Sequence, residues 1–352
     1  MIKMKENKGI TLVALTITII ILLILAGVTL SLVIGENGLI AKSKQSAEKY
    51  KDKAKEEQWQ LEDFEAGMEE IGLDELQDEE KNPELKPMKL VLNITEENTK
   101  IELPINKESD EYNYDCTVKW GDDTEDKVTN ENVKNVSHTY EKKGMYTLTI
   151  TGIFENIYTE YWQNNNMLKA LVKVIQWGKT ELKHVQLAGC ENLIELAEPS
   201  KNSFINIKSF FYSFRGDTSL KEIPQNLFAN CPDVTSFGFA FSECSSLTSI
   251  PKNLFANCPN VDSFNFTFSK CSSLTSVPEN LFANCPNVTR FDYAFVDCIN
   301  LKGKSIQLWN EENRQAKGIT RNSGGEGCYA NCENLDDYAD VPDYWKKDTR
   351  PV

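Results

Sequence analysis

The sequence has little histidine and a deficit of positive charge. Only His138 and His184 occur among 352 residues, so a metal shell built on imidazole has few possible ligands. Against 53 acidic residues stand 38 lysines and arginines, giving a formal charge of -15. This balance disfavours nucleic-acid binding, because phosphate backbones require clustered cations.

Recognisable catalytic chemistry is also missing from the sequence. Nothing pairs Asp or Glu with a metal shell or a positioned nucleophile. The sequence therefore predicts a protein that is not an enzyme and that uses no cofactor and no metal. A glycan hydrolase with carboxylates along the chain is the catalytic alternative.

Cysteine is plentiful and falls in a regular register. Seven of the ten cysteines recur in a repeat: Cys190, Cys231, Cys244, Cys258, Cys271, Cys285 and Cys298. We expect them to be free thiols packed in the interior. Disulfides between neighbouring copies, such as Cys231 with Cys258, are the alternative, but side chains in one column would point the same way. Cys328 and Cys332 have a spacing that could serve a metal, although neither histidine is near them in sequence.

The most regular feature is a repeat of 27 residues. Three near-identical copies begin at Ser219, Ser246 and Ser273, a degenerate copy precedes them, and a half copy occupies 329–335. Such a period predicts a solenoid. The constant apolar columns are expected to form interior ladders: Leu220, Leu247, Leu274; Ile223, Ile250, Val277; Phe228, Phe255, Phe282; Phe237, Phe264, Phe291; and Phe241, Phe268, Phe295. Burial of one Phe contributes about 1.5–3 kcal/mol, so the ladders can stabilise the array without disulfides.

This repeat resembles the BspA-type leucine-rich repeats, including those of mycoplasmal surface lipoproteins, over residues 182–346. The resemblance implies a bacterial cell-surface protein whose leucine-rich-repeat head binds a protein or glycan ligand in adhesion or recognition. Contact positions are expected where the copies differ and the core does not. These are Gly238, Asn265, Asp292, Arg290 and Lys270, with Ser236, Ser263, Glu243 and Asp297. Neutral drift on a solvated surface is the alternative for each of them.

A long apolar run lies near the amino terminus. Residues 10–34 carry no charge and as a helix would rise roughly 37 Å, more than the ~30 Å of a hydrocarbon core. They predict a transmembrane helix and a single-pass protein of the cell membrane with its C-terminal bulk extracellular. Lysines between residues 42 and 55 oppose this orientation under the positive-inside rule.

The leader MIKMKENKG, residues 1–9, ends in Gly9 directly before the apolar run. It resembles the prepilin signal of type IV pilins and pseudopilins. That resemblance implies cleavage between Gly9 and Ile10 by a prepilin peptidase, and methylation of Ile10. Ala14 departs from the family, whose polymerising members usually carry Glu there. A minor pilin-like component of a type IV filament or secretion assembly is the alternative function. For the N-terminal segment itself, a plain signal anchor is the alternative interpretation.

Between the apolar run and the repeats the sequence predicts four segments. Residues 35–66 continue as an amphipathic helix, and 67–87 form an acidic linker. Period-two alternation in KLVLNI, IELPI, DCTVKW and MYTLTI predicts strands within 88–152. Residues 153–181 form a connector that closes this module and caps the solenoid, and 347–352 are a tail.

The module at 88–152 contains WGDDT and SHTYEKKGMY, which resemble the signature of polycystic-kidney-disease-like (PKD-like) domains, immunoglobulin-like sandwiches. The matching residues are Trp120, Gly121, Asp122, His138, Tyr140, Gly144 and Tyr146. In that family they serve the turn and the core, while an acid–base pair of Asp122 and His138 is the functional alternative. The predicted fold class is thus mixed and multidomain: an N-terminal transmembrane and extended α-helix, a small β-sandwich and a C-terminal leucine-rich-repeat solenoid.

Overall fold

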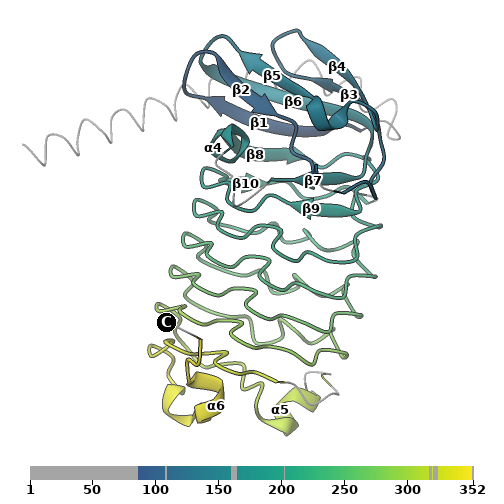
Figure 1. The fold of residues 1–352 in the computed structure, drawn as a ribbon. Helices are drawn as coiled ribbons and strands as arrows, with labels where there is room; N and C mark the ends of the chain where they lie inside the picture. The colour runs from purple at the N-terminus through teal and green to yellow at the C-terminus, as the bar shows by residue number, and fades with distance from the viewer. Residues whose placement is uncertain are drawn as a thin grey trace, which may run out of the picture. The chain divides into compact units, whose positions relative to one another are not determined.

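The computed structural model describes residues 86–107, 109–159, 165–201, 203–316, 319 and 324–350. All of them belong to one compact unit, Leu76–Val352. Strands gather at one end of this unit, a stack of coils follows, and two short helices lie at the other end (Figure 1).

The strands are β1 (Met88–Ile94), β2 (Thr99–Glu102), β3 (Tyr114–Lys119), β4 (Glu125–Thr129), β5 (Ser137–Tyr140), β6 (Gly144–Phe154), β7 (Asn156–Tyr158), β8 (Leu171–Gln176), β9 (His184–Gln186) and β10 (Glu195–Leu196). The helices are α4 (Asn166–Ala170), α5 (Glu311–Ala316) and α6 (Asp343–Lys346), with 3-10 turns η2 (Val133–Asn135) and η3 (Tyr338–Asp340). Of the four segments predicted as strands from their alternation, three are confirmed as β1, β3 and β6, whereas only the first two residues of IELPI lie in a strand, β2.

A six-stranded sheet in the order β10-β8-β1-β6-β3-β4 forms the largest β element. Its pairs are antiparallel except for β8 with β10. β1 lies between β8 and β6 and is buried along almost its whole length. Residues 153–181, predicted as a connector and cap, supply β7, α4 and β8, so one of their strands enters the sheet beside β1.

The β2–β5 pair packs on this sheet through aromatic side chains. Tyr140 of β5 lies 4.2 Å from Tyr146 of β6, measured between ring centroids. Its hydroxyl donates a hydrogen bond of 2.8 Å to the carbonyl oxygen of Trp120. Trp120 and Tyr140 are both buried, so this contact belongs to the core between the strand pair and the sheet.

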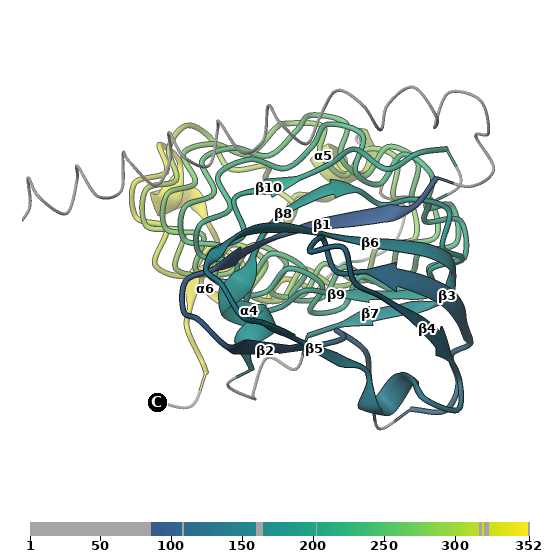
Figure 2. The ribbon, with the colours of Figure 1, turned by 90° about the horizontal axis from the view of Figure 1, so that it is seen from above.

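Two parallel strand pairs join the sheet region to the coils. β8 pairs with β10, and β7 pairs with β9. Seen down the stack, these two pairs are well separated (Figure 2). The first coil is therefore held at two places, and the buried apolar residues of strands and coils form one continuous core from Met88 to Trp345.

Successive coils are joined by hydrogen bonds that recur every 27 residues. Isolated parallel bridges pair Ser209 with Ser236, and Ser236 with Ser263, and they continue to Arg290 and Gly324. After each bridge, alternate backbone N–H groups donate to the next coil, as from Phe237, Phe239, Phe241 and Glu243 to Ser263, Asn265, Thr267 and Ser269 at 2.7–3.0 Å. The intervening N–H groups of Ala240 and Ser242 bond within their own coil. Most of the backbone polar groups are thus satisfied without a continuous strand.

The predicted phenylalanine ladders are confirmed. Phe237 stacks on Phe264 at 5.7 Å, Phe228 on Phe255 at 5.9 Å and Phe241 on Phe268 at 5.6 Å, all within 7° of parallel. These rings are fully buried. Because the columns interdigitate, for example Phe237 with Phe255 at 4.6 Å, removal of one ring disturbs several neighbours.

All ten cysteines are free and buried, as expected for thiols that pack in the interior. The Sγ atoms of Cys244, Cys271 and Cys298 donate to carbonyl oxygens of the preceding coil at 3.0–3.1 Å. Burial raises the pKa of the Cys231 and Cys285 thiols to about 12. These side chains are therefore neutral and structural near pH 7.

The structure corrects the predicted fold class of the repeats. Between residues 182 and 346, the described part of the chain has two short strands, two short helices, one 3-10 turn and isolated bridges. It is a stack of turn-rich coils, and the prediction of a leucine-rich-repeat solenoid is wrong. The physical reason is a left-handed backbone with φ of 56° at Phe239, Phe266 and Tyr293. Each lies three residues after a bridge and turns the chain before an extended strand can form.

The prediction of a single-pass protein of the cell membrane is also corrected. The described ranges contain more strand than helix, and their longest helix, α5, has six residues. None of these helices combines the length and the apolar character needed to cross a bilayer. The segment on which that prediction rested, 10–34, lies outside the described residues. So do 1–9, 35–66 and most of the acidic linker 67–87.

Candidate ligand-binding surfaces

A second set of stacked rings runs along the outside of the coils. We call it the outer aromatic column: Tyr212, Phe239, Phe266 and Tyr293. Successive ring centroids lie 4.8, 4.4 and 4.7 Å apart, with interplanar angles of 28°, 6° and 23°. The first three residues are half-buried, and Phe266 and Tyr293 belong to a cluster separate from the main core.

The local backbone places these rings outside the core. All four residues have positive φ, from 56° to 61°, a conformation that costs a residue with a Cβ roughly 1–2 kcal/mol. The recurring hydrogen bonds between coils hold this conformation at each position. Stacking of each ring against the next coil offsets this cost. Sequence alignment alone does not reveal this stacking.

Charged side chains line one side of the outer aromatic column. The Arg215 guanidinium lies 5.2 Å from the Tyr212 ring centroid and 5.8 Å from that of Phe239. Arg215 and Lys270 both pair with Glu243, at 3.1 and 3.2 Å. Burial alone would raise the pKa of Glu243, but the charges and hydrogen bonds of these two cations hold it below its usual value.

The chain's own C-terminal residues cover the last ring of the column. The Arg350 guanidinium lies 5.8 Å from the Tyr293 ring centroid and pairs with Asp297 at 2.8 Å. Thr349 lies with its Oγ1 2.5 Å from the Tyr293 hydroxyl oxygen. The last ring is therefore covered by a short peptide segment, while Phe211 at the other end is 44% exposed.

Gly238, a predicted contact residue, lies beneath Phe211. A Cβ at this glycine would meet ring atoms of Phe211 at 2.8 and 2.9 Å. The Phe211 ring also contacts Tyr212 at 4.3 Å and Phe239 at 5.7 Å between centroids. The missing side chain at 238 thus allows Phe211 to lie against the outer aromatic column.

The other predicted contact residues have bonds within the stack. Asn265 accepts a hydrogen bond from the Asp292 N–H at 2.9 Å, and Asp292 accepts one from the Glu326 N–H at 2.9 Å. Arg290 is exposed and pairs with Asp262 at 2.7 Å. Lys270 is exposed beside the outer aromatic column. Of the further candidates, Ser236 and Ser263 are bridge residues, while Glu243 and Asp297 are the acids of the ion pairs described above.

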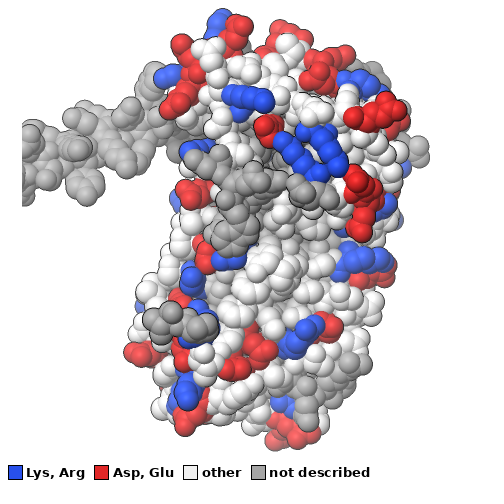
Figure 3. Space-filling view, viewed as in Figure 1, with Lys and Arg blue, Asp and Glu red and all other residues white. Residues whose placement is uncertain are grey.

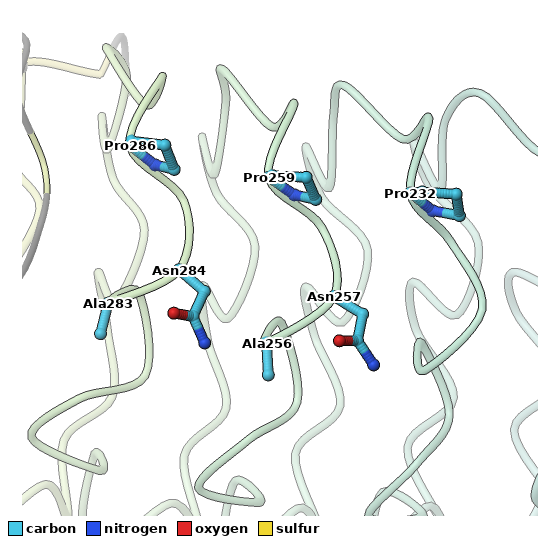
Figure 4. A pocket seen from close by; sticks show the side chains of 7 residues that line it. All are labelled: Pro232, Ala256, Asn257, Pro259, Ala283, Asn284 and Pro286. Carbon is cyan, nitrogen blue, oxygen red and sulfur yellow. The ribbon is translucent and has the colours of Figure 1, made fainter.

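Sequence reasoning missed a shallow trough across three coils, with a volume of about 600 Å³. It is lined by Pro232, Ala256, Asn257, Pro259, Ala283, Asn284 and Pro286 (Figure 4). None of these seven residues is charged. Their recurrence at 27 residues is visible in the sequence, but nothing there distinguishes surface prolines from turn residues.

Charges of both signs are interspersed over the surface of the strands and coils seen in Figure 3. Ion pairs such as Lys208 with Asp233 join neighbouring coils. Phosphate backbones require concentrated cations, and this face instead carries charges of both signs.

The structure brings Asp122 and His138 together, with 2.6 Å between Oδ2 and Nε2. The Trp120 ring stacks on the His138 ring at 5.1 Å, and Thr124 Oγ1 donates to Asp122 Oδ1 at 2.6 Å. Burial would raise the pKa of Asp122, but the hydrogen bonds from Thr124 and His138 lower it. This arrangement fixes the turn after β3.

Other predicted sites give little chemistry. Cys328 and Cys332 are buried, and the described residues contain no cluster of three or more His, Cys, Asp or Glu side chains suited to a metal ion. The predicted processing residues Gly9 and Ile10 lie outside the described residues.

Comparisons with known proteins add no assignment. Neither a family model, nor a curated protein, nor a solved structure matches the chain. The resemblances to BspA-type repeats, PKD-like domains and prepilins therefore stay predictions.

Proposed function

We propose that the chain is a non-enzymatic recognition protein whose coil stack binds a protein ligand along the outer aromatic column. The observation that carries this proposal is a row of aromatic rings outside the main core, three of them half-buried, with Phe211 at its open end 44% exposed. Contiguous exposed apolar surface rimmed by polar residues is typical of interaction sites. Adhesion is one role that such a protein serves.

A protein ligand fits this surface better than a glycan. The rings stack face to face at 4.4–4.8 Å, so their edges and not their faces meet solvent. Sugars stack on open ring faces, whereas protein interfaces use mixed packing of aromatic and arginine side chains. Arg215 beside Phe239 and Lys270 beside Glu243 supply the polar rim.

Selection of a random peptide library on the immobilised protein tests this proposal. Selected peptides should bind the wild type and lose at least about tenfold in affinity with Phe211→Ala, as for an interface hot spot. Ile153→Ala is the matched control, because Ile153 is 40% exposed but lies in β6 of the sheet. Equal affinity for wild type and Phe211→Ala would refute the assignment of the surface.

A further inference from the structure

We propose that the trough of Figure 4 is a second binding site, for a linear, uncharged, β-linked polysaccharide that runs along the stack. It is separate from the outer aromatic column, so it does not rest on the function proposed above.

The lining combines rigid apolar rings with amide groups. Pro232, Pro259 and Pro286 lie in a row on successive coils, and Asn257 and Asn284 point in the same direction from theirs (Figure 4). Proline has a fixed φ and no side-chain freedom to lose, so contact with it costs little entropy. Apolar walls with a few oriented polar groups are typical of sites for small organic ligands.

The two amides present hydrogen-bonding atoms to a ligand. Asn257 donates its Nδ2 to the carbonyl oxygen of Ala229 at 2.9 Å, which fixes the amide and leaves Oδ1 as an acceptor. Within the described residues, the Asn284 amide has no hydrogen-bond partner, so it can both donate and accept. Sugar hydroxyls are donors and acceptors at once and match this pair.

The absence of charge in the lining of the trough discriminates between neutral and anionic ligands. The chain carries a formal charge of -15, and the seven residues of the trough include no cation to attract a phosphate or a uronate. An anionic polymer would meet repulsion without compensation. The trough therefore favours a neutral chain over nucleic acid or an acidic glycan.

The repeat spacing distinguishes a sugar chain from a peptide. Bridged coils lie about 4.8 Å apart, and next to the trough the stacked rings of Phe255 and Phe282 are 6.0 Å apart. An extended peptide rises about 3.3 Å per residue, or about 6.6 Å per pair of residues on one face. Both peptide distances, about 3.3 and about 6.6 Å, lie outside the range from the coil spacing to the ring spacing. The advance of one β-linked pyranose unit along its chain lies inside this range. One sugar can thus meet the same proline and asparagine groups on every coil.

Calorimetric titration of the protein with neutral β-1,4-linked glucose oligosaccharides of two to six units tests this inference. We expect affinity to rise with length and to level off once the oligosaccharide spans the three coils of the trough. Asn257→Ala and Asn284→Ala should each weaken binding of the hexasaccharide about 3- to 10-fold, the loss of one neutral hydrogen bond.

Asn300→Ala is the matched control. Asn300 donates its Nδ2 to the carbonyl oxygen of Ser272 at 2.8 Å, the same bond between coils as Asn257, but it lies outside the trough. Because Asn284 bonds to no described residue, its variant should fold like the wild type. Equal affinity for two and six units, equal weakening by Asn300→Ala, or no binding of the hexasaccharide would each overturn the proposal. Peptides selected on the outer aromatic column should bind Asn284→Ala unchanged, so the two proposals fail separately.

Discussion

Asp217 offers the sharpest test of how the coils pack. It takes the position that Cys190 and Cys244 occupy in the adjacent coils, and it is fully buried. Its Oδ1 accepts a hydrogen bond from the Cys190 N–H at 2.9 Å, while Oδ2 has no partner among the described residues. Burial raises the pKa of Asp217 well above its usual value, so folding favours the protonated form of the carboxyl group.

The sign of the pH dependence follows from this shift. A carboxyl group whose pKa is higher in the folded than in the unfolded state binds a proton more tightly on folding. The contribution of Asp217 is fully present below its unfolded pKa of about 3.9, and stability falls by about 1.4 kcal/mol for each pH unit above that. The loss ends at the folded pKa. In Asp217→Asn the side chain keeps its shape and Oδ1, but it does not titrate.

Urea unfolding of wild type and Asp217→Asn at a series of pH values measures this effect. Above about pH 4, the free energy of unfolding of the variant should rise relative to that of the wild type by about 1.4 kcal/mol per pH unit. The new amide adds an offset that does not depend on pH and does not change this slope. Asp336→Asn, at an exposed position, should show no such slope. A difference that is flat with pH, or that favours the wild type as pH rises, would refute the buried, protonated carboxyl group.

Three further predictions concern packing and the turn of the sheet. Phe255→Ala removes a ring that stacks between two others and should cost about 3–5 kcal/mol in urea unfolding. Gly325→Ala should cost about 1–3 kcal/mol, because its Cβ would lie 2.1 Å from the Trp345 ring, whereas Gly324→Ala, whose nearest contact is 3.4 Å, should change the melting temperature little. Asp122→Asn should cost about 1.5–3 kcal/mol near pH 7 by weakening charge-assisted hydrogen bonds. Since the folded pKa is lowered, that difference should shrink as pH falls through the acidic range.

Each of these outcomes can fail on its own. A Phe255→Ala cost below about 1 kcal/mol would mean that the ladder is loosely packed. Equal effects of the two glycine variants would contradict close packing of Trp345 on the last coil. A cost of Asp122→Asn that does not change with pH would show that the side chain acts by shape and not by charge.

The sequence predicted the buried parts of the fold well, for a physical reason. Strand alternation and the recurring phenylalanines report which faces are apolar, and burial of apolar faces decides packing. Phe228, Phe255 and Phe282 therefore stack as expected. The column of thiols was visible too, and alignment at 27 residues places Asp217 in it, although its burial was not foreseen.

The parts that were missed depend on backbone geometry that side-chain patterns do not encode. The positive φ at Phe239 and Phe266 turns the chain within each repeat and places their rings outside the main core. The entry of β8 beside β1 is a long-range pairing that no local pattern indicates. Gly238 was predicted as a contact because it differs between copies, yet it is small because Phe211 covers it.

Both proposed surfaces exist only if the coils stack in register, so native-state hydrogen exchange of the repeat amides tests the account most directly. The N–H groups of Phe237, Phe239 and Phe241, which donate to the next coil, should be protected as strongly as those of β1 and should open together with them as one unit. Free exchange at these amides, with protection confined to the sheet, would contradict the stack.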